Sequence, residues 1–297
     1  MLTLFFHGLL TADELAKRAA YPQQGTTPEF FASLIEYFLS AGYRFISPEE
    51  LDTGVDPRGK YAMLTFDDGY FNNSRAVPVL ERFQVPATIF VSALHVTESR
   101  GFWWETLYHV RSRQGKTDQQ IGQEMQVLNA LRTTEILNRI SPELGNEIFT
   151  WRGDADRPFS LAELREISRH PLVNIGNHTA DHDILISCSP KEAEATIGAA
   201  QDVLKEITGK SPISIAYPNG NVNERVCDIA KAQGLRIGFA AFRRKEYLPN
   251  ALHPERRMIL GRFPPLGNLG IQRQADYFRS DLMLVEHLQQ LKKSVFK

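Results

Sequence analysis

Short apolar runs alternate along the chain with segments whose apolar residues recur at helical spacing. None of these runs shows the alternation of apolar and polar residues that is typical of a strand with one solvent-exposed face. Both faces of the sheet should therefore be buried, as in parallel sheets. The runs that we interpret as strands are Leu2 to Phe6, Tyr61 to Phe66, Ala87 to Val91, Leu172 to Ile175, Ile213 to Tyr217 and Leu235 to Ala240.

The segments between the runs carry start and stop signals for helices. One helix should begin at Thr27-Pro28-Glu29 and end at Gly42, a second should begin at Ser189-Pro190 and end before Gly209, and the capping box Ser160 to Glu163 opens a third. Strand and helix alternate throughout, which predicts an α/β fold with a parallel sheet, either open or closed into a barrel. Functional groups should then lie at the carboxyl ends of the strands.

The segment from about Gly101 to Arg157 breaks this alternation. It contains a polar helical pattern from Ile121 to Ile140 and no convincing strand, which indicates an inserted helical cap within a single domain spanning residues 1–297. Trp103 and Trp104 open this segment. They could belong to the core of the cap or offer a stacking surface for a sugar ring.

The composition of the chain excludes several classes of protein. The chain has 297 residues, with 34 Lys and Arg against 35 Asp and Glu, so it lacks the basic excess of a general nucleic-acid binder. Two cysteines are too few for a disulfide framework. No stretch is long and apolar enough for a transmembrane helix. We interpret the apolar start, MLTLFFHGLL, as a strand rather than a signal peptide, which favours the cytoplasm.

Two adjacent carboxylates end the second long run, in the sequence TFDDGY. An ordinary turn would explain one Asp before the glycine, but two neighbouring carboxylates repel each other at a strand end unless a cation or a shared proton compensates. Asp67 and Asp68 therefore indicate either a plain turn or a site for metal or acid–base chemistry.

A pair of histidines follows another strand, in the sequence NHTADH. His178 and His182 are four residues apart at the strand's carboxyl end. Two imidazoles and one carboxylate from a second strand make a metal site with open positions for water and substrate. With Asp68 as the third ligand, Asp67 is left to take a proton from water activated by the cation.

Together, TFDDGY and NHTADH resemble the polysaccharide deacetylase, or NodB-homology, family of carbohydrate esterases (family 4). The resemblance implies a distorted (β/α) barrel and a divalent-metal hydrolase that removes acetyl groups from N-acetylated amino sugars. In that family's pattern Asp67 matches the catalytic base, whereas Asp68, His178 and His182 match the metal ligands. The segment 101–157 would be a variable helical insertion.

A third family motif, Arg-x-Pro followed by an aromatic, appears here as AYPNG. Ala216 stands where the family has the arginine that orients the base, and Asn219 stands where it has the aromatic residue. The resemblance implies that the Asn219 N–H helps to bind the oxyanion. Arg262 could replace the missing arginine, or it could form only a surface salt bridge. We also expect Tyr217 to contact the substrate.

The family's late histidine, the general acid for the leaving amine, has no clear counterpart near the end of this chain. His253 is a weak candidate in an apparent loop. His7 is a better one, because it ends the first strand, and some biofilm-polysaccharide deacetylases carry the acid histidine on such a strand. The alternative is that His7 is a structural histidine at a strand end.

Zinc is the default metal for this ligand set, although cobalt, nickel, manganese or iron would also fit. The expected partner is an N-acetylated glycan or amino-sugar precursor, without nucleic acid. Two alternatives stay open. One is an esterase or deformylase acting on another acyl group, and the other is a glycan-binding protein with little catalysis, which the replacement of the motif arginine by Ala216 would explain.

Overall fold

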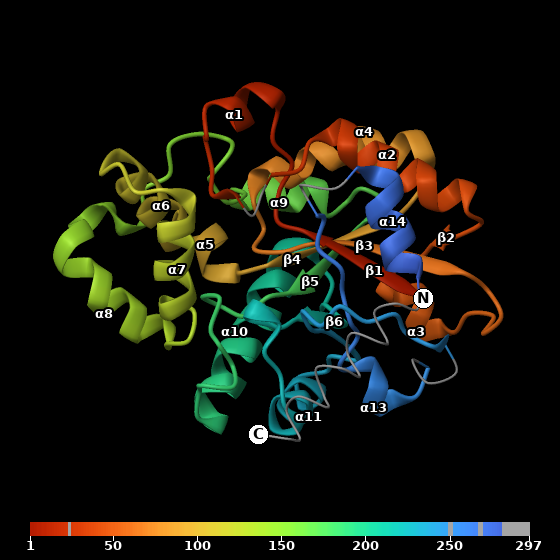
Figure 1. The fold of residues 1–297 in the computed structure, drawn as a ribbon. Helices are drawn as coiled ribbons and strands as arrows, with labels where there is room; N and C mark the ends of the chain where they lie inside the picture. Colours follow the sequence, from red (N-terminus) through yellow and green to blue (C-terminus); the bar gives the residue numbers. More distant parts are fainter. Residues whose placement is uncertain (23–24, 249–251, 267–269, 281–297) are drawn as a thin grey trace, which may run out of the picture.

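The computed structural model describes residues 1–22, 25–248, 252–266 and 270–280. Seven parallel strands form one curled sheet at the centre of the molecule (Figure 1). Their order is β1-β3-β4-β5-β6-β7, with β2 also pairing with β3. The strands are β1 (Leu2–Phe6), β2 (Arg44–Phe45), β3 (Tyr61–Phe66), β4 (Ala87–Val91), β5 (Val173–Asn177), β6 (Ser214–Ala216) and β7 (Ile237–Phe239).

A short segment, Leu260 to Phe263, connects the two ends of the sheet. Leu260 forms a parallel bridge with Phe239 of β7, and Phe263 forms one with Leu4 of β1. Backbone hydrogen bonds of 2.8–3.0 Å support both bridges. The curled sheet therefore approaches a closed barrel, as expected for a distorted (β/α) barrel.

Helices surround the sheet. In Figure 1, α2, α4, α9 and α14 lie above it, α10, α11 and α13 lie below it, and α6, α7 and α8 stand apart at the left. The helices are α1 (Ala12–Ala16), α2 (Pro28–Ser40), α3 (Pro48–Thr53), η2 (Phe71–Ala76), α4 (Val77–Phe83), α5 (Ala93–Thr97), α6 (Trp103–Arg113), α7 (Asp118–Leu128), α8 (Thr133–Leu144), η3 (Gly145–Phe149), α9 (Leu161–Ile167), α10 (Pro190–Thr208), η4 (Pro218–Gly220), α11 (Glu224–Ala232), α13 (Pro254–Arg257) and α14 (Ile271–Arg279).

The predicted helix signals are confirmed by their hydrogen bonds. Thr27 accepts the Phe30 N–H at the start of α2, and both Ser160 and Ser189 form reciprocal capping boxes at the starts of α9 and α10. Gly209 ends α10 with φ of 77°, a left-handed conformation that glycine adopts at little cost. Three predicted strands have the predicted bounds, whereas β2 is an additional strand of two residues.

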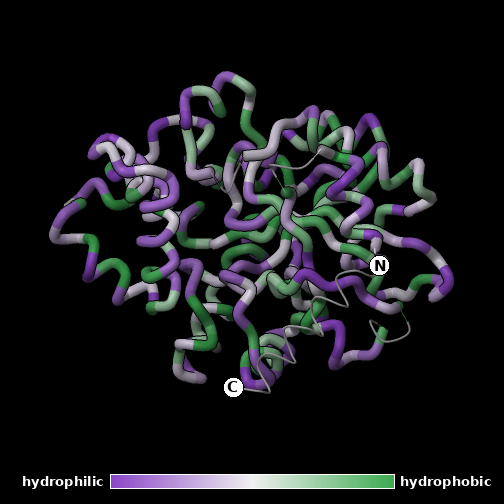
Figure 2. Tube along the Cα trace, in the orientation of Figure 1, coloured by the Kyte–Doolittle hydropathy of each residue, from purple (hydrophilic) through white to green (hydrophobic). Residues whose placement is uncertain are grey.

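The strands are apolar and the polar residues lie mainly on the outside, as Figure 2 shows. Phe6 of β1, Phe31 of α2 and Phe66 of β3 form one cluster, with the Phe6 ring 5.1 Å from Phe31 and 5.4 Å from Phe66. Each of these side chains is fully buried. Burial of one such ring stabilises the fold by roughly 1.5–3 kcal/mol, so this cluster fixes the carboxyl ends of β1 and β3.

The segment 101–157 is helical, as predicted. Its helices α6, α7 and α8 have their own apolar core, and the buried Arg111 of α6 joins them by ion pairs to Glu124 of α7 and Glu143 of α8. No helix within the described residues combines the length and hydropathy needed to cross a membrane.

Candidate active site

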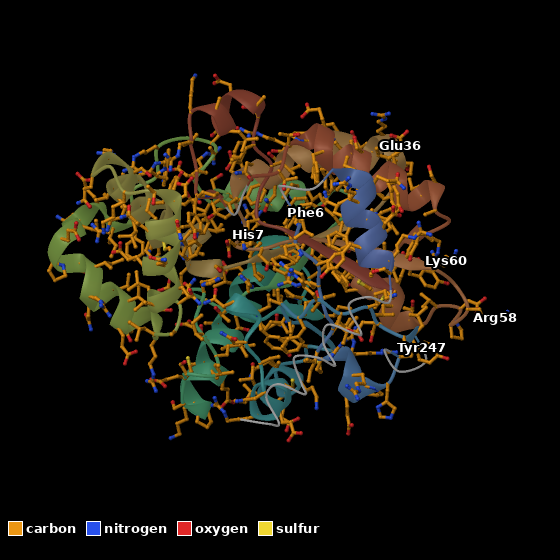
Figure 3. All side chains as sticks on the ribbon, viewed as in Figure 1. Phe6, His7, Glu36, Arg58, Lys60 and Tyr247 are labelled. Atoms are coloured by element: carbon orange, nitrogen blue, oxygen red, sulfur yellow. The ribbon has the colours of Figure 1, made fainter. Side chains whose placement is uncertain are left out.

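The carboxyl ends of β1, β3 and β5 meet at one cavity of about 560 Å³. His7 follows β1, Asp67 and Asp68 follow β3, and His178 follows β5. In Figure 3, His7 lies at the end of β1 that faces the helical insertion, far from Arg58 and Lys60 on the opposite side. Residues from three distant parts of the sequence are therefore brought together where a parallel sheet presents functional groups.

Asp67 is held by a buried arginine. The two guanidinium nitrogens of Arg262 donate to the two carboxylate oxygens of Asp67 at 2.7 and 2.8 Å. Arg262 is only 1% exposed, so the surface salt bridge considered from the sequence is wrong. Burial alone would raise the pKa of Asp67, but the charges of Arg262 and His178 hold that pKa below its ordinary value. Asp67 is therefore ionised and fixed in orientation.

Asp68 faces both histidines of the NHTADH motif. Its Oδ1 atom lies 3.2 Å from Nε2 of His178 and 3.5 Å from Nε2 of His182. One ligand atom from each of the three residues lies within 4.8 Å of the others. This compact set of one carboxylate and two imidazoles is the donor set that zinc and related divalent cations prefer.

The hydrogen bonds around this set fit a cation. Nδ1 of His178 lies 2.7 Å from the backbone oxygen of Ala216, which can only accept, so Nδ1 donates there and Nε2 is the ring nitrogen left for a ligand on the Asp68 side. Burial lowers the pKa of His182 to about 3, so the ring of His182 is neutral. Oδ1 of Asp68 is buried without a hydrogen-bond donor. Acceptors converging on one point need a positive charge between them.

The backbone around these ligands adopts conformations that are rare for residues with a side chain. Asp68 has φ of 72°, Thr179 has 64° and His182 has 53°. Buried Asn177 stabilises the second turn, since its side-chain oxygen accepts the Thr179 N–H at 2.8 Å. Such strained turns persist where the surrounding structure determines them, commonly at functional sites.

His7 and Asn219 border the same cavity. His7 is half-buried, and its backbone oxygen accepts from Asn73 at 2.7 Å, which fixes the end of β1. Asn219 lies in η4 with φ of 54°. Its backbone N–H donates to no group among the described residues, which leaves it free to face a ligand. His253, the weaker candidate acid, is exposed at the start of α13 and does not line this cavity.

The two tryptophans have different surroundings in the structure. Trp104 lines the cavity, with its ring centroid 4.9 Å from that of His182, and its Nε1 donates to the Tyr70 hydroxyl at 2.7 Å. Trp103 is 4% exposed and packs in the core of the insertion. The prediction that Trp103 contacts substrate is therefore wrong, because its ring is used for packing.

Tyr217 requires the same correction. Its side chain is fully buried, and its hydroxyl faces the Cys227 sulfur at 3.8 Å rather than the cavity. Tyr217 follows β6, and strand residues alternate in direction, so its side chain points into the packing beneath α11.

Several residues at the site gave no signal in the sequence. Buried Glu105 of α6 accepts from the Tyr70 hydroxyl at 2.9 Å and from the Tyr21 N–H at 2.7 Å. This carboxylate therefore joins the insertion to the turn after Asp68 and to the cavity wall at Tyr21. A long-range contact of this kind has no sequence spacing that would reveal it. The contribution of α7 to the cavity was missed for the same reason.

Comparisons with known proteins agree with this geometry. The chain is 20% identical over 213 residues to YxkH of Bacillus subtilis (strain 168), a protein assigned to the polysaccharide deacetylases. The aligned residues are 70% of this chain and 56% of YxkH. It thus spans about half the length of that relative. A second relative from the same organism, the peptidoglycan-N-acetylmuramic acid deacetylase PdaC, is 26% identical over 98 residues, which are 33% of this chain and 21% of PdaC.

Solved structures share the fold. The Streptococcus pyogenes deacetylase PplD, in complex with acetate, superposes with a TM-score of 0.62 at 19% identity, covering 93% of this chain and 96% of that one. IcaB from Ammonifex degensii gives a TM-score of 0.61 at 18% identity, covering 94% and 97%. Residues 54–238, well over half of the chain, match the sequence profile of the polysaccharide deacetylases. The chain therefore belongs to the polysaccharide deacetylase family.

Proposed function

We propose that this protein hydrolyses N-acetyl groups from an amino-sugar glycan, with a divalent cation held by Asp68, His178 and His182. Zinc is the first candidate, and cobalt, nickel, manganese or iron fit the same donors. When bound, the cation would polarise the acetamide carbonyl and make a coordinated water more acidic. The remaining chemistry falls to the side chains of the cavity.

Asp67 serves as the general base. It is ionised, lies next to the metal ligand Asp68 in sequence, and is held by Arg262 so that one lone pair can face the attacking water. As the water oxygen bonds to the carbonyl carbon, its proton passes to the Asp67 carboxylate. Arg262 stabilises the carboxylate and sets its direction without contacting the substrate.

His7 serves as the general acid. The carbon–nitrogen bond breaks only if the leaving amine gains a proton, and His7 borders the cavity at the end of β1. Asn219 contributes its backbone N–H to the oxygen that becomes negative during attack, although its side chain stands where the family motif has an aromatic residue. The products are acetate and the free amino sugar.

One observation carries this proposal. The ion pair of Asp67 with Arg262 lies beside Asp68, whose carboxylate faces the two motif histidines. A protein that only binds glycans has no need for a buried, ionised Asp67 held by Arg262, because burial of such a pair is costly. An esterase or deformylase would use the same residues, and a panel of acyl esters and amides separates either one from an N-deacetylase.

The test is acetate release from N-acetylglucosamine oligomers by metal-loaded protein, compared with protein stripped by EDTA and then reloaded. We expect release that disappears on stripping and returns on reloading. Release of a different acyl group only, or activity that is insensitive to stripping, would overturn the proposal.

A further inference from the structure

Helix α7 of the insertion borders the cavity with one stripe of its surface. Gly122, Met125, Gln126 and Asn129 all line the cavity, and their spacing of three and four residues places them on one helix face. The neighbouring face of α7 packs into the core of the insertion. The stripe is therefore held rigidly against whatever occupies the cavity.

Gly122 is unexpected within a helix. Glycine in a helix interior costs about 1 kcal/mol relative to alanine. A Cβ atom built at Gly122 would meet no atom within 4 Å, so neither a close packing contact nor a left-handed backbone requires glycine. What the missing side chain does provide is space on the side of the cavity.

The polar groups in this part of the cavity are uncharged amides. Gln126 of α7 and Asn221, just after η4, both line the cavity, and neither side chain has a hydrogen-bond partner among the described residues. Arg262 is the single Lys or Arg among the described residues that line the cavity, and Asp67 neutralises it. Amides both donate and accept, as sugar hydroxyls and acetamides do.

We infer that this stripe of α7 binds the sugar unit next to the one that is deacetylated. The ligand is an uncharged hexose or N-acetylhexosamine ring, which lies in the space left by Gly122 and forms hydrogen bonds with Gln126 and Asn221. The cavity of about 560 Å³ is larger than an acetamide alone requires. The inference rests on the proposed function insofar as the occupant is a glycan.

The test uses two substitutions on the stripe, Gly122→Phe and Gln126→Ala, and two controls, Gln123→Phe and Gln123→Ala. Gln123 is exposed on the same helix and lies outside this cavity. Binding of N-acetylglucosamine oligomers to metal-loaded protein is measured by calorimetry. Hydrolysis of the same oligomers and of a small aryl acetate is measured in parallel.

We expect Gly122→Phe to weaken oligomer binding about tenfold or more, and Gln126→Ala to weaken it severalfold. Aryl acetate hydrolysis and the Gln123 variants should stay within about twofold of the wild type, because a small substrate does not reach α7. Gly122→Ala should weaken oligomer binding less than Gly122→Phe does and unfold at a higher temperature, which would show that α7 itself tolerates a side chain there.

The outcomes distinguish this inference from the proposed function. Wild-type oligomer affinity in both stripe variants would overturn the inference, even if the wild type releases acetate. Weakened binding in both, without acetate release from the wild type, would support the inference and overturn the proposed function. An absence of oligomer binding by the wild type would overturn the inference as well.

Discussion

The buried pair of Asp67 and Arg262 allows a quantitative prediction. Replacing Arg262 by Met keeps an unbranched, apolar side chain of similar length but removes the guanidinium. Asp67 is 4% exposed, so its carboxylate would remain buried without the two hydrogen bonds of 2.7 and 2.8 Å that neutralise it. The protein must then tolerate a buried charge or bind a proton at Asp67.

Both routes cost a similar amount of free energy. Removing one partner of a buried ion pair typically costs about 3–5 kcal/mol. Protonating a carboxyl group of ordinary pKa, about 3.9, costs about 4 kcal/mol at pH 7, at 1.36 kcal/mol for each pH unit. We therefore expect Arg262→Met to lower the free energy of unfolding by about 4 kcal/mol. Acetate release should fall about 100-fold or more, because a protonated Asp67 cannot act as base.

The assay is urea unfolding, in EDTA, of the wild type, Arg262→Met, Asp67→Asn and the double variant. The double variant should recover much of the stability lost in Arg262→Met, because no charge then remains buried. Arg236 provides the control, since its ion pair with Asp52 is half exposed and Arg236→Met should cost less than about 1 kcal/mol.

A loss below about 1 kcal/mol in Arg262→Met, or a double variant whose loss equals the sum of the single losses, would refute this reasoning. It would mean that the pair is not energetically coupled and that another group holds Asp67.

Three further predictions concern other parts of the account. His7→Gln should reduce acetate release from an N-acetylated sugar at least about 100-fold. It should leave aryl acetate hydrolysis nearly unchanged, because a phenolate leaves without a proton. An equal loss on both substrates would contradict the role of His7 as general acid. Trp104→Ala should raise KM for oligomers, because Trp104 lines the cavity. Trp103→Ala should lower the melting temperature with little change in KM, because Trp103 packs in the core of the insertion. The reverse pattern would contradict this assignment of the two tryptophans. Arg157 lowers the pKa of Glu163 to about 2, so the pair contributes stability above about pH 4.5 that is lost as the pH falls through 2. Glu163→Gln should therefore cost about 1 kcal/mol at pH 7, after allowance for solvent screening, and almost nothing near pH 2. Urea unfolding across this range checks the prediction, and Glu166→Gln, at an exposed position on the same helix, is the control that should cost little at pH 7.

The barrel could be predicted from the sequence because local patterns and global fold agree. Apolar runs with two buried faces, and helices with clear caps, predict a parallel α/β sheet, and residues after the strands then meet at one edge. The placement of Asp68, His178 and His182 around one point followed from this rule. The short strand at Arg44 was missed because two residues carry no periodicity.

Contacts set by side-chain direction could not be predicted in the same way. Trp103 and Trp104 are neighbours on α6, so roughly 100° of helix rotation separates a core residue from a cavity residue, and neither residue type distinguishes the two. Tyr217 was misassigned because its position after β6 was clear but its side-chain direction was not. The contact between Arg262 and Asp67 depends on the closure of the barrel by residues 260–263, which the sequence left open.

The central claim is that the two neighbouring acids have separate roles, with Asp68 binding the metal and Asp67 acting as base. The most direct measurement is metal content and acetate release, determined on the same samples of wild type, Asp67→Asn and Asp68→Asn. We expect Asp67→Asn to retain one divalent cation and lose turnover, and Asp68→Asn to lose both. Loss of the cation in Asp67→Asn, or full metal binding in Asp68→Asn, would contradict this division of roles.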